Sequence, residues 1–332
     1  MRAWIVDHYG KDGLRLGEMR KPDIQDHDVL VQVHAAGINQ LDYKVRGGAF
    51  KQILPYKPPF ILGHDVAGVV LAVGSLVERF KPGDEIYARP ADYRIGTFAE
   101  FIAVHENDVA LKPESLTMIE AAAVPLVALT AWQALVEKAG LQKGQKVFIQ
   151  AGSGGVGTFA IQLAKHLGAT VATTTSAANI DLVKSLGADV VIDYKKDDFE
   201  TLLHDYDVVL NSQDTKSLEK SLRVLKPGGI LISISGPPDP TFAKDVGLSW
   251  ILRQAIRMLS AQVRRKAARR SVRYSFLFMK ASGDQLRELS QLISAGIIQP
   301  VIDRVFPFDA TADALAYIEK GRAMGKVVVN VK

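Results

Sequence analysis

The sequence predicts an α/β protein with two domains: a β-rich, partly open barrel and a doubly wound parallel sheet. The chain has 332 residues, more than one hydrophobic core usually supports. Up to about residue 118 the pattern is one of short strands separated by turns. Beyond that point, long helical patterns alternate with short runs of branched aliphatic residues, as in a parallel sheet with helices on both faces.

The strands expected in the first part are short and bounded by glycine, proline, aspartate or asparagine. They cover residues 3–6, 28–38, 65–74, 84–88 and 97–104. Such a succession is typical of a small barrel or open sheet, and the final strand expected at 326–331 is predicted to return to this domain.

The second part begins with a helical pattern at 119–141. Strands are expected at 146–150, 170–175, 190–193, 206–211 and 229–235. Helices are expected between them at 156–169, 179–188 and 215–225. A strand at 274–280 and an amphipathic helix at 282–298 follow.

Composition excludes several classes of site. Hydrophobic residues make up 48% of the chain and charged residues 23%, values ordinary for a soluble globular protein. The absence of cysteine excludes disulfides, thiolate nucleophiles, zinc fingers and iron–sulfur ligation. No run of 18 apolar residues and no signal-peptide pattern is visible, so we expect a cytoplasmic protein.

A glycine-rich loop joins the strand at 146–150 to the next helix and matches G-x-G-x-x-G. It reads Gly152-Ser153-Gly154-Gly155-Val156-Gly157. In such loops Gly152 would allow a tight turn, Gly154 would let a pyrophosphate approach the backbone, and Gly157 would let helix and strand pack closely. Free N–H groups and the helix dipole then hold the phosphates. This context predicts dinucleotide binding, against the alternative of a glycine connector with no ligand.

The end of the next strand favours NADPH over NADH. An NAD site usually places an acidic residue there to bind the ribose 2′-hydroxyl, but no acid occurs before Asp181. The residues that suit a 2′-phosphate instead are Thr175, Ser176, Asn179 and Lys184. The alternative is an ordinary strand end with a solvated lysine.

Long motifs along the whole chain resemble the medium-chain dehydrogenase/reductase superfamily, in its zinc-independent quinone oxidoreductase and enone reductase branch. They are "AAGINQLDYKVRGG" (35–48), "PFILGHDVAGVVLAVG" (59–74), "FKPGDEIYA" (80–88), "GTFAEFIAV" (96–104), "AAAVPLVALTAWQAL" (121–135) and "GKVVVNV" (325–331), together with the glycine loop.

The resemblance implies a discontinuous GroES-like catalytic domain at 1–124 and 273–332 and a Rossmann NADP-binding domain at 125–272. It also implies an active site in the cleft between the domains and a homodimer formed by pairing of Rossmann sheet edges.

The zinc enzymes of this superfamily have cysteine where this chain has Asn39, and glutamate where it has Asp65. The remaining His64 with its neighbouring aspartate is a poor tetrahedral zinc site, so no metal is expected and His64 is interpreted as structural. Without a Lewis acid, alcohol oxidation loses its usual stabilisation of the alkoxide. Hydride transfer from NADPH to a quinone or to the β-carbon of an enone does not need a Lewis acid.

The resemblance also indicates which residues would form the active site. Asn39 could donate to the substrate carbonyl, Tyr43 could wall the pocket or bond the developing enolate, and Asp42 would organise their loop, with Arg46 as a partner. Turn chemistry or packing is the alternative for each.

Further cofactor contacts are implied by matching positions. Thr130 would approach the nicotinamide end, and Tyr194 the adenosine 2′-phosphate. Ser235, Gly236 and Asn211 would border the nicotinamide ribose. The alternatives are a helix hydroxyl bonded to its own backbone for Thr130 and packing at a strand edge for Tyr194.

Residues 253–273 depart from the family by concentrating basic residues in a helical pattern. Eight cations fall in this segment, and no acid lies between Asp245 and Asp284. This predicts a solvated helix or an oligomer contact, or alternatively a surface for RNA or membrane. The second hypothesis for the whole protein is therefore a dinucleotide-binding protein that binds RNA or membrane through this segment, with incidental reductase activity.

Overall fold

The computed structural model describes all 332 residues and divides them into two compact units. The first contains Met1–Leu129 and Lys280–Lys332, and the second Thr130–Met279. The second unit extends past the predicted boundary at residue 272, because the strand that begins at Arg273 pairs with the parallel sheet of that unit. The expected strand at 274–280 is correspondingly shorter and ends at Phe276.

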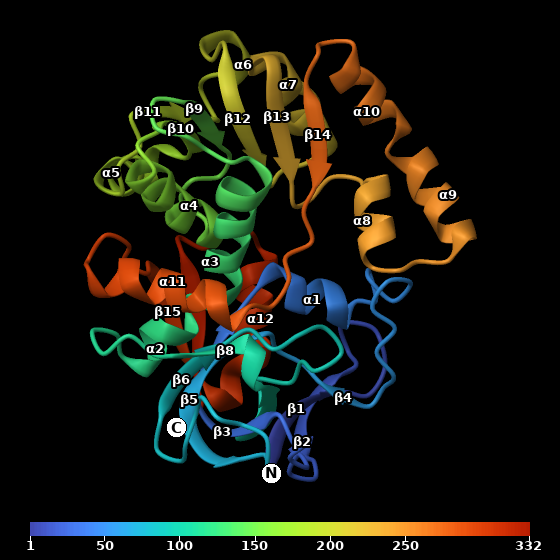
Figure 1. Cartoon of the computed structure of the whole chain (residues 1–332), viewed down its shortest axis with the longest axis vertical. Helices are drawn as coiled ribbons and strands as arrows, with labels where there is room; N and C mark the ends of the chain where they lie inside the picture. Colours follow the sequence, from blue (N-terminus) through green and yellow to red (C-terminus); the bar gives the residue numbers. More distant parts are fainter. The chain divides into compact units, whose positions relative to one another are not determined.

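The first unit contains a mostly antiparallel seven-stranded sheet and a three-stranded sheet (Figure 1). The larger sheet has the order β15-β16-β3-β5-β6-β8, with β7 also paired to β3. Its strands are β3 (Asp28–Ile38), β5 (Asp65–Val73), β6 (Glu85–Ala88), β7 (Phe101–His105), β8 (Val109–Leu111), β15 (Ile302–Pro307) and β16 (Lys326–Asn330). The smaller sheet contains β1 (Arg2–Val6), β2 (Leu14–Glu18) and β4 (Phe60–Ile61).

The long strand β3 organises the first unit. It pairs with β5 on one side and with β7 and β16 on the other. Valines of β3 and β5 face a common core, among them Val29, Val31 and Val66. Antiparallel pairing of Val328 with Gly37 confirms that the end of the chain returns to this unit.

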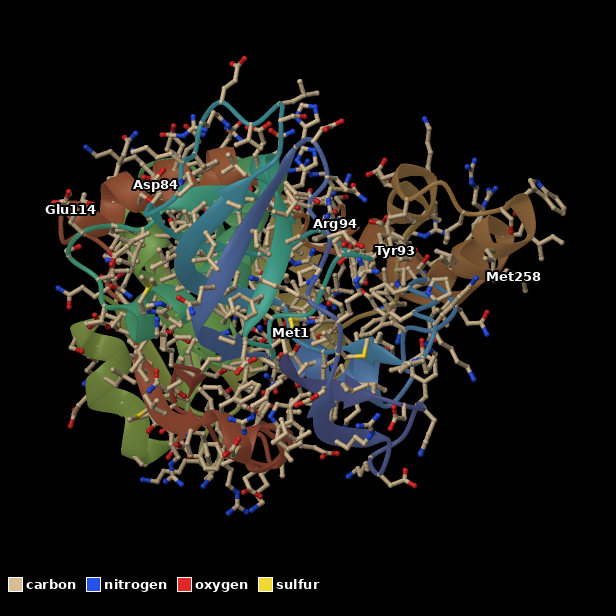
Figure 2. All side chains as sticks on the ribbon, turned by 90° about the horizontal axis from the view of Figure 1, so that it is seen from below. Met1, Asp84, Tyr93, Arg94, Glu114 and Met258 are labelled. Atoms are coloured by element: carbon tan, nitrogen blue, oxygen red, sulfur yellow. The ribbon has the colours of Figure 1, made fainter.

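Ion pairing fixes the start of β3. The guanidinium of Arg94 donates to both carboxylate oxygens of Asp28, at 2.8 and 2.7 Å. Arg94 is labelled in Figure 2, beside Tyr93. A bidentate bond of this kind holds the loop around residue 94 against the strand.

The helices of the first unit cover the ends and edges of these sheets. They are α1 (Gln40–Arg46), α2 (Met118–Ala122), α11 (Gly283–Ser294) and α12 (Thr311–Glu319), with short 3₁₀ turns at Glu106–Asp108 and Phe308–Ala310. The single helix expected at 119–141 is wrong. It is divided into α2, α3 (Pro125–Trp132) and a π-helical turn at Gln133–Lys138, because Pro125 lacks an N–H and begins a new helix.

The second unit is a six-stranded parallel sheet in the order β11-β10-β9-β12-β13-β14. Its strands are β9 (Lys146–Ile149), β10 (Thr170–Thr175), β11 (Val190–Asp193), β12 (Tyr206–Asn211), β13 (Leu225–Ser233) and β14 (Arg273–Phe276). The chain runs outward from β9 to β11 and then resumes on the other side of β9, which is the Rossmann order. The strand order therefore reverses beside β9, at the carboxyl end of which the glycine loop begins.

Helices connect these strands and pack on the sheet (Figure 1). They are α4 (Gly155–His166), α5 (Ile180–Ser185), α6 (Phe199–Leu202), α7 (Thr215–Val224), α8 (Pro240–Asp245), α9 (Trp250–Leu259) and α10 (Ala261–Ala268), with a 3₁₀ turn at Ala177–Asn179. The core beneath α7 and α10 includes Phe148, Leu218 and Val263. None of the helices is long and apolar enough to cross a membrane.

Candidate functional site

The glycine loop lies between β9 and α4, and two of its glycines are required by close packing. A Cβ on Gly157 would lie 2.3 Å from the carbonyl oxygen of Ala151 and 2.6 Å from the Cα of Gly152. A Cβ on Gly152 would lie 2.1 Å from Oγ1 of Thr173. The role predicted for Gly157 agrees with this geometry. The turn itself uses Ala151, whose φ is 51°, so Gly152 is needed for its contact with Thr173 and not for a positive φ.

Gly154 faces a space with almost no neighbours. A Cβ there would meet only the carbonyl oxygen of Ala151, at 3.3 Å. Gly154 also caps α4, whose first helical bond runs from the N–H of Thr158 to its carbonyl. The N–H groups of Gly155, Val156 and Gly157 come before this first bond, so they have no partner within the helix. They lie at the N-terminus of a 12-residue helix, where the helix dipole is positive. This arrangement fits a pyrophosphate held by backbone donors.

Hydroxyl and amide groups gather beside the loop at the end of β10. The Oγ1 of Thr175 donates to the Oγ of Ser153 at 2.9 Å, and the Nδ2 of Asn179 donates to the same oxygen at 3.2 Å. The N–H of Tyr194 reaches the carbonyl of Thr175 at 3.2 Å, and its ring is 60% exposed. Thr175, Asn179 and Tyr194, which are expected near the adenosine 2′-phosphate, are therefore neighbours, and two of them bond to Ser153 of the glycine loop, with no carboxylate among these contacts.

Ser176 and Lys184 are also expected near the 2′-phosphate, and neither forms a hydrogen bond with Ser153 in the structure. Ser176 follows β10 directly and is the N-cap of the 3₁₀ turn that contains Asn179. Lys184 is exposed on α5, and the structure records no contact between it and Ser153, Thr175 or Asn179. The expectation that its ammonium meets a 2′-phosphate stays a prediction.

A buried polar network connects the ends of β9, β12 and β13. The amide nitrogen of Asn211 donates to Oε1 of Gln150 at 2.6 Å, and its amide oxygen accepts from Oγ of Ser233 at 2.6 Å. The Oγ of Ser233 in turn accepts the N–H of Gly236 at 2.8 Å. Asn211 is fully buried, so its side chain braces the three strand ends, and the cofactor contact expected for it stays a prediction.

Gly236 and Ser235 form the turn that follows β13. Ser235 is exposed, and its hydroxyl donates to the carbonyl of Gln213 at 2.6 Å. Gly236 has no room for a side chain, because a Cβ would lie 2.8 Å from the phenol oxygen of Tyr274. Thr130, predicted to approach the nicotinamide, is buried on α3.

In the first unit, Asn39 and Asp65, the two positions at which the zinc enzymes differ from this chain, form a closed network around the ammonium of Lys326. Its Nζ donates to Oδ1 of Asn39 at 2.6 Å, to Oδ2 of Asp65 at 3.0 Å and to the carbonyl of Ile38 at 3.2 Å. The Nδ2 of Asn39 donates to Asp65 at 2.9 Å, and Asp65 also accepts the N–H of Leu126 at 2.8 Å. A lysine cation therefore lies between the side chains of Asn39 and Asp65.

His64 belongs to the same buried region but not to that network. Its Nδ1 lies 2.5 Å from Oδ1 of Asp42, and both side chains are fully buried. The other oxygen of Asp42 accepts the N–H of Asn39 at 2.7 Å, which fixes the start of α1. No group of three or more histidine, cysteine, aspartate or glutamate side chains is arranged to hold a metal ion.

These contacts change the roles expected in the loop around α1. Asn39 is 5% exposed, and both ends of its amide are bonded inside the protein, so it is held as part of the network and its contact with a substrate carbonyl stays a prediction. Asp42 organises the loop by accepting the N–H of Asn39, and its other oxygen contacts His64. Arg46 instead pairs with Glu319 at 3.5 Å.

Tyr43 lies on α1 and is half-buried. Burial raises the pKa of its phenol, and the charge of Glu319 raises it further. The phenol is therefore neutral at physiological pH and can donate a hydrogen bond. Among the three predicted catalytic residues, Tyr43 is the one whose polar group is not placed in the buried network.

The sequence interpretation missed Lys326, Gln150 and Ser233. Each is a polar residue at the end of a strand that is otherwise buried, and a polar group in such a place needs a partner. That pattern is readable in the sequence, since Lys326 begins the apolar run "KVVVNV" and Gln150 ends "KVFIQ".

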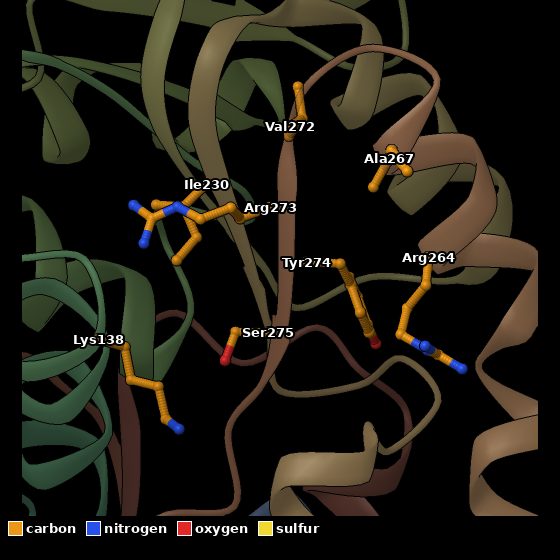
Figure 3. Close-up of a pocket in the computed structure, with 9 residues that line it drawn as sticks. Lys138, Ile230, Arg264, Ala267, Val272, Arg273, Tyr274 and Ser275 are labelled. Atoms are coloured by element: carbon orange, nitrogen blue, oxygen red, sulfur yellow. The ribbon is translucent and has the colours of Figure 1, made fainter.

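A hollow of about 430 Å³ lies beside β14 in the second unit, and Figure 3 shows its lining. Arg273, Tyr274 and Ser275 contribute from the strand, and Lys138 and Arg264 from neighbouring helices. The strand β14 pairs only with β13 and is the last strand of the sheet.

Two family profiles match the chain. Residues 25–114 match "Alcohol dehydrogenase GroES-like domain", and residues 186–329 match "Zinc-binding dehydrogenase". The glycine loop lies between the two matched ranges.

Curated relatives match along almost the whole chain. A 2-methylene-furan-3-one reductase of Solanum lycopersicum is 39% identical over 99% of this chain and 79% of its own length. NAD(P)H oxidoreductase RTN4IP1, mitochondrial, of Danio rerio is 37% identical over 100% and 91%. The chloroplastic NADPH-dependent alkenal/one oxidoreductase of Arabidopsis thaliana is 37% identical over 99% and 79%.

Solved structures share the fold over their full length. The quinone oxidoreductase from Coxiella burnetii is 30% identical, with a TM-score of 0.87, and the alignment covers 100% of this chain and 99% of that one. A mycobacterial protein complexed with NADPH is 26% identical, with a TM-score of 0.82 and full coverage of both chains.

Proposed function

Because the chain belongs to the medium-chain dehydrogenase/reductase superfamily, in its zinc-independent quinone oxidoreductase and enone reductase branch, we propose that it is an NADPH-dependent oxidoreductase. Its substrates are quinones or the carbon–carbon double bonds of α,β-unsaturated carbonyl compounds. The observation that carries this proposal is the open cradle at Gly154, at the N-terminus of α4, in a chain that matches such reductases from end to end.

The residues of the glycine loop fit the pyrophosphate of a dinucleotide. The N–H groups of Gly155, Val156 and Gly157 would donate to phosphate oxygens, and the missing side chain of Gly154 would let the pyrophosphate approach the backbone. When bound, NADPH supplies the hydride that reduces the acceptor.

Selectivity for NADPH follows from the cluster at the end of β10. Ser153, Thr175 and Asn179 offer hydroxyl and amide groups where an NAD-selective protein places a carboxylate. A carboxylate would repel a 2′-phosphate, whereas these neutral donors can bond to it. The exposed ring of Tyr194 lies beside Thr175 and can cover the adenosine end.

On the substrate side, the chemistry requires a donor to the carbonyl oxygen, which gains negative charge as the double bond is reduced. Tyr43 is the best candidate, because its phenol remains protonated and half-buried. Lys326, Asn39 and Asp65 hold the strand ends from which α1 begins, so they position the helix that carries this donor, and the contact of Asn39 with a substrate carbonyl remains a prediction.

The decisive experiment measures NADPH oxidation by the purified protein with a panel of 2-alkenals, cyclic enones and quinones. We expect turnover with at least one of these classes, and slower turnover with NADH. Absence of turnover with every acceptor, in a protein that binds NADPH, would favour the hypothesis of a dinucleotide-binding protein with incidental reductase activity.

Two further properties are proposed from the sequence: a cytoplasmic location and a homodimer formed by paired sheet edges. The free edge of β14, with its adjoining hollow, supports the second (Figure 3). Sedimentation velocity of the wild type over a range of concentrations tests the dimer. Fractionation of cells that express the tagged chain tests the location.

A further inference from the structure

Helix α9 is apolar on the face that points away from its unit. Ile256 is 8% exposed and packs inward. Ile251 and Met258 lie about 140° and about 200° from it around the helix, given about 100° per residue. These two side chains are 72% and 78% exposed. Figure 2 shows Met258 on the outer side of this segment.

Two more large apolar residues lie at the ends of the helix and flank this face on opposite sides, Trp250 about 120° and Leu259 about 60° from Ile256. Trp250 is 73% exposed and Leu259 is 63% exposed. We call these two residues together with Ile251 and Met258 the outer face of α9. Large apolar side chains rarely gather in this way on a surface that meets only water, so the outer face indicates a contact.

The surroundings of the outer face are strongly basic. Arg253 and Arg257 lie on the helix itself, and no acidic residue occurs between Asp245 and Asp284. Of the eight cations in residues 253–273, only Lys266 is paired with a carboxylate, that of Glu219. Arg253 donates instead to the carbonyl of Leu248, so its charge is not neutralised.

The basic and the apolar residues together indicate which kind of partner binds α9. A second copy in a symmetric contact through this face would set unneutralised arginines against their own copies. Single-stranded nucleic acid would need stacking aromatic residues, and the outer face has only Trp250. An anionic lipid surface satisfies both features, because its headgroups neutralise the arginines and its acyl boundary accepts tryptophan, isoleucine, methionine and leucine.

We propose that α9 binds the surface of an anionic membrane, lying in the plane of the interface with its outer face inserted. This binding site is separate from the glycine loop and does not depend on reductase activity. It brings the enzyme to the place where apolar substrates accumulate.

Vesicle co-sedimentation of the full chain tests the proposal. Vesicles of equal parts phosphatidylcholine and phosphatidylglycerol should bind the protein, and vesicles of phosphatidylcholine alone should not. Binding should weaken as salt rises from about 0.1 M to about 1 M, which shortens the Debye length from about 10 Å to about 3 Å.

Two double variants separate the contribution of the positive charges from that of the apolar side chains. Arg253→Gln with Arg257→Gln should weaken partitioning by about thirtyfold, at about fivefold for each cation. Ile251→Ser with Met258→Ser should weaken it by more than about tenfold, even at low salt. As a matched control, Lys320→Gln with Arg322→Gln removes two exposed cations elsewhere and should leave binding unchanged.

Trp250 is a native reporter of insertion, since Trp4 is buried and Trp132 partly buried. Its fluorescence should shift to the blue on addition of the anionic vesicles, and Trp250→Phe should abolish the shift. The proposal is overturned if the wild type fails to sediment with anionic vesicles, or if the control and the α9 variants bind equally. It is also overturned if an RNA mobility shift or a change of oligomeric state, and not vesicle binding, responds to the α9 variants.

Discussion

The Nζ atom of Lys326 lies 3.0 Å from Oδ2 of Asp65, and the two buried side chains are 261 residues apart in the chain. The lysine is the first residue of the strand β16, and the aspartate is the first residue of β5. Their ion pair, with Asn39 bonded to both, holds the ends of β3, β5 and β16 together.

Lys326→Met should destabilise the protein by about 3–5 kcal/mol, because it leaves the buried carboxylate of Asp65 without its cation. Urea denaturation followed by circular dichroism measures this. Lys332→Met is the matched control, since Lys332 is exposed and its loss should cost less than about 0.5 kcal/mol. Equal stability of the two variants would contradict a structural role for the ion pair.

Gly154→Ala and Gly157→Ala should have different effects, although both change the glycine loop. The first should fold with a loss below about 1 kcal/mol and bind NADPH about tenfold or more weakly, because its Cβ enters only the open cradle. The second should lose about 1–3 kcal/mol of stability, because its Cβ meets backbone atoms of Ala151 and Gly152. Calorimetric titration and thermal unfolding measure the two quantities. Normal NADPH affinity in Gly154→Ala would show that the phosphates bind elsewhere.

Ser176→Asp should reverse the cofactor preference. The position is an N-cap, where aspartate is well tolerated, and a carboxylate beside Thr175 would repel a 2′-phosphate. We expect the affinity for NADPH to fall about tenfold to a hundredfold, and that for NADH to hold or rise. Thr170→Asp, at the exposed opposite end of β10, is the control and should change neither affinity. The ratio of the two dissociation constants, from fluorescence titration, is the measured result.

Tyr43→Phe should lower kcat with the best acceptor by about a hundredfold, since it removes a donor to the developing negative charge. The KM for NADPH should be unchanged. Tyr317→Phe removes a phenol that donates to Asp303 in the same unit, and it should leave kcat unaffected. If both variants turn over at the wild-type rate, Tyr43 lines the loop without contributing to the chemistry.

Stability at low pH should depend on the Asp28–Arg94 pair. Burial alone raises the pKa of Asp28, but hydrogen bonds from Arg94 and from the N–H of Gln25 outweigh it, and the net pKa lies below the ordinary value. A carboxyl group with a depressed pKa stabilises the fold above its unfolded pKa of about 3.9. That stabilisation is lost as pH falls through the lower, folded value.

Arg94→Gln should therefore cost about 2 kcal/mol near pH 7 and make the unfolding free energy less sensitive to pH below about 4. Arg20→Gln removes a partner of Asp23 in a pair that is almost fully exposed, and it should change neither quantity. Urea titrations at several pH values between neutral and strongly acidic provide the comparison. A steeper acid dependence in Arg94→Gln than in the wild type would refute the assignment.

Local patterns in the sequence were enough to predict most of the elements. The strands at 28–38, 170–175, 190–193 and 206–211 match β3, β10, β11 and β12 in both bounds, because alternation and branched residues identify a strand from its own few positions. Short elements such as β4 and β8 escaped this reasoning, since two or three residues give no period.

Some functional features could likewise be identified from the sequence, whereas others required the folded structure. The identity of residues over short stretches was enough to identify the glycine loop, the absence of an acid after β10 and the absence of cysteine. That Asn211 and Asn39 are held in buried networks, which Lys326 and Gln150 complete, became clear from the folded structure alone. A buried polar group must find a partner, but the folded topology alone brings residues so distant in sequence within hydrogen-bonding distance.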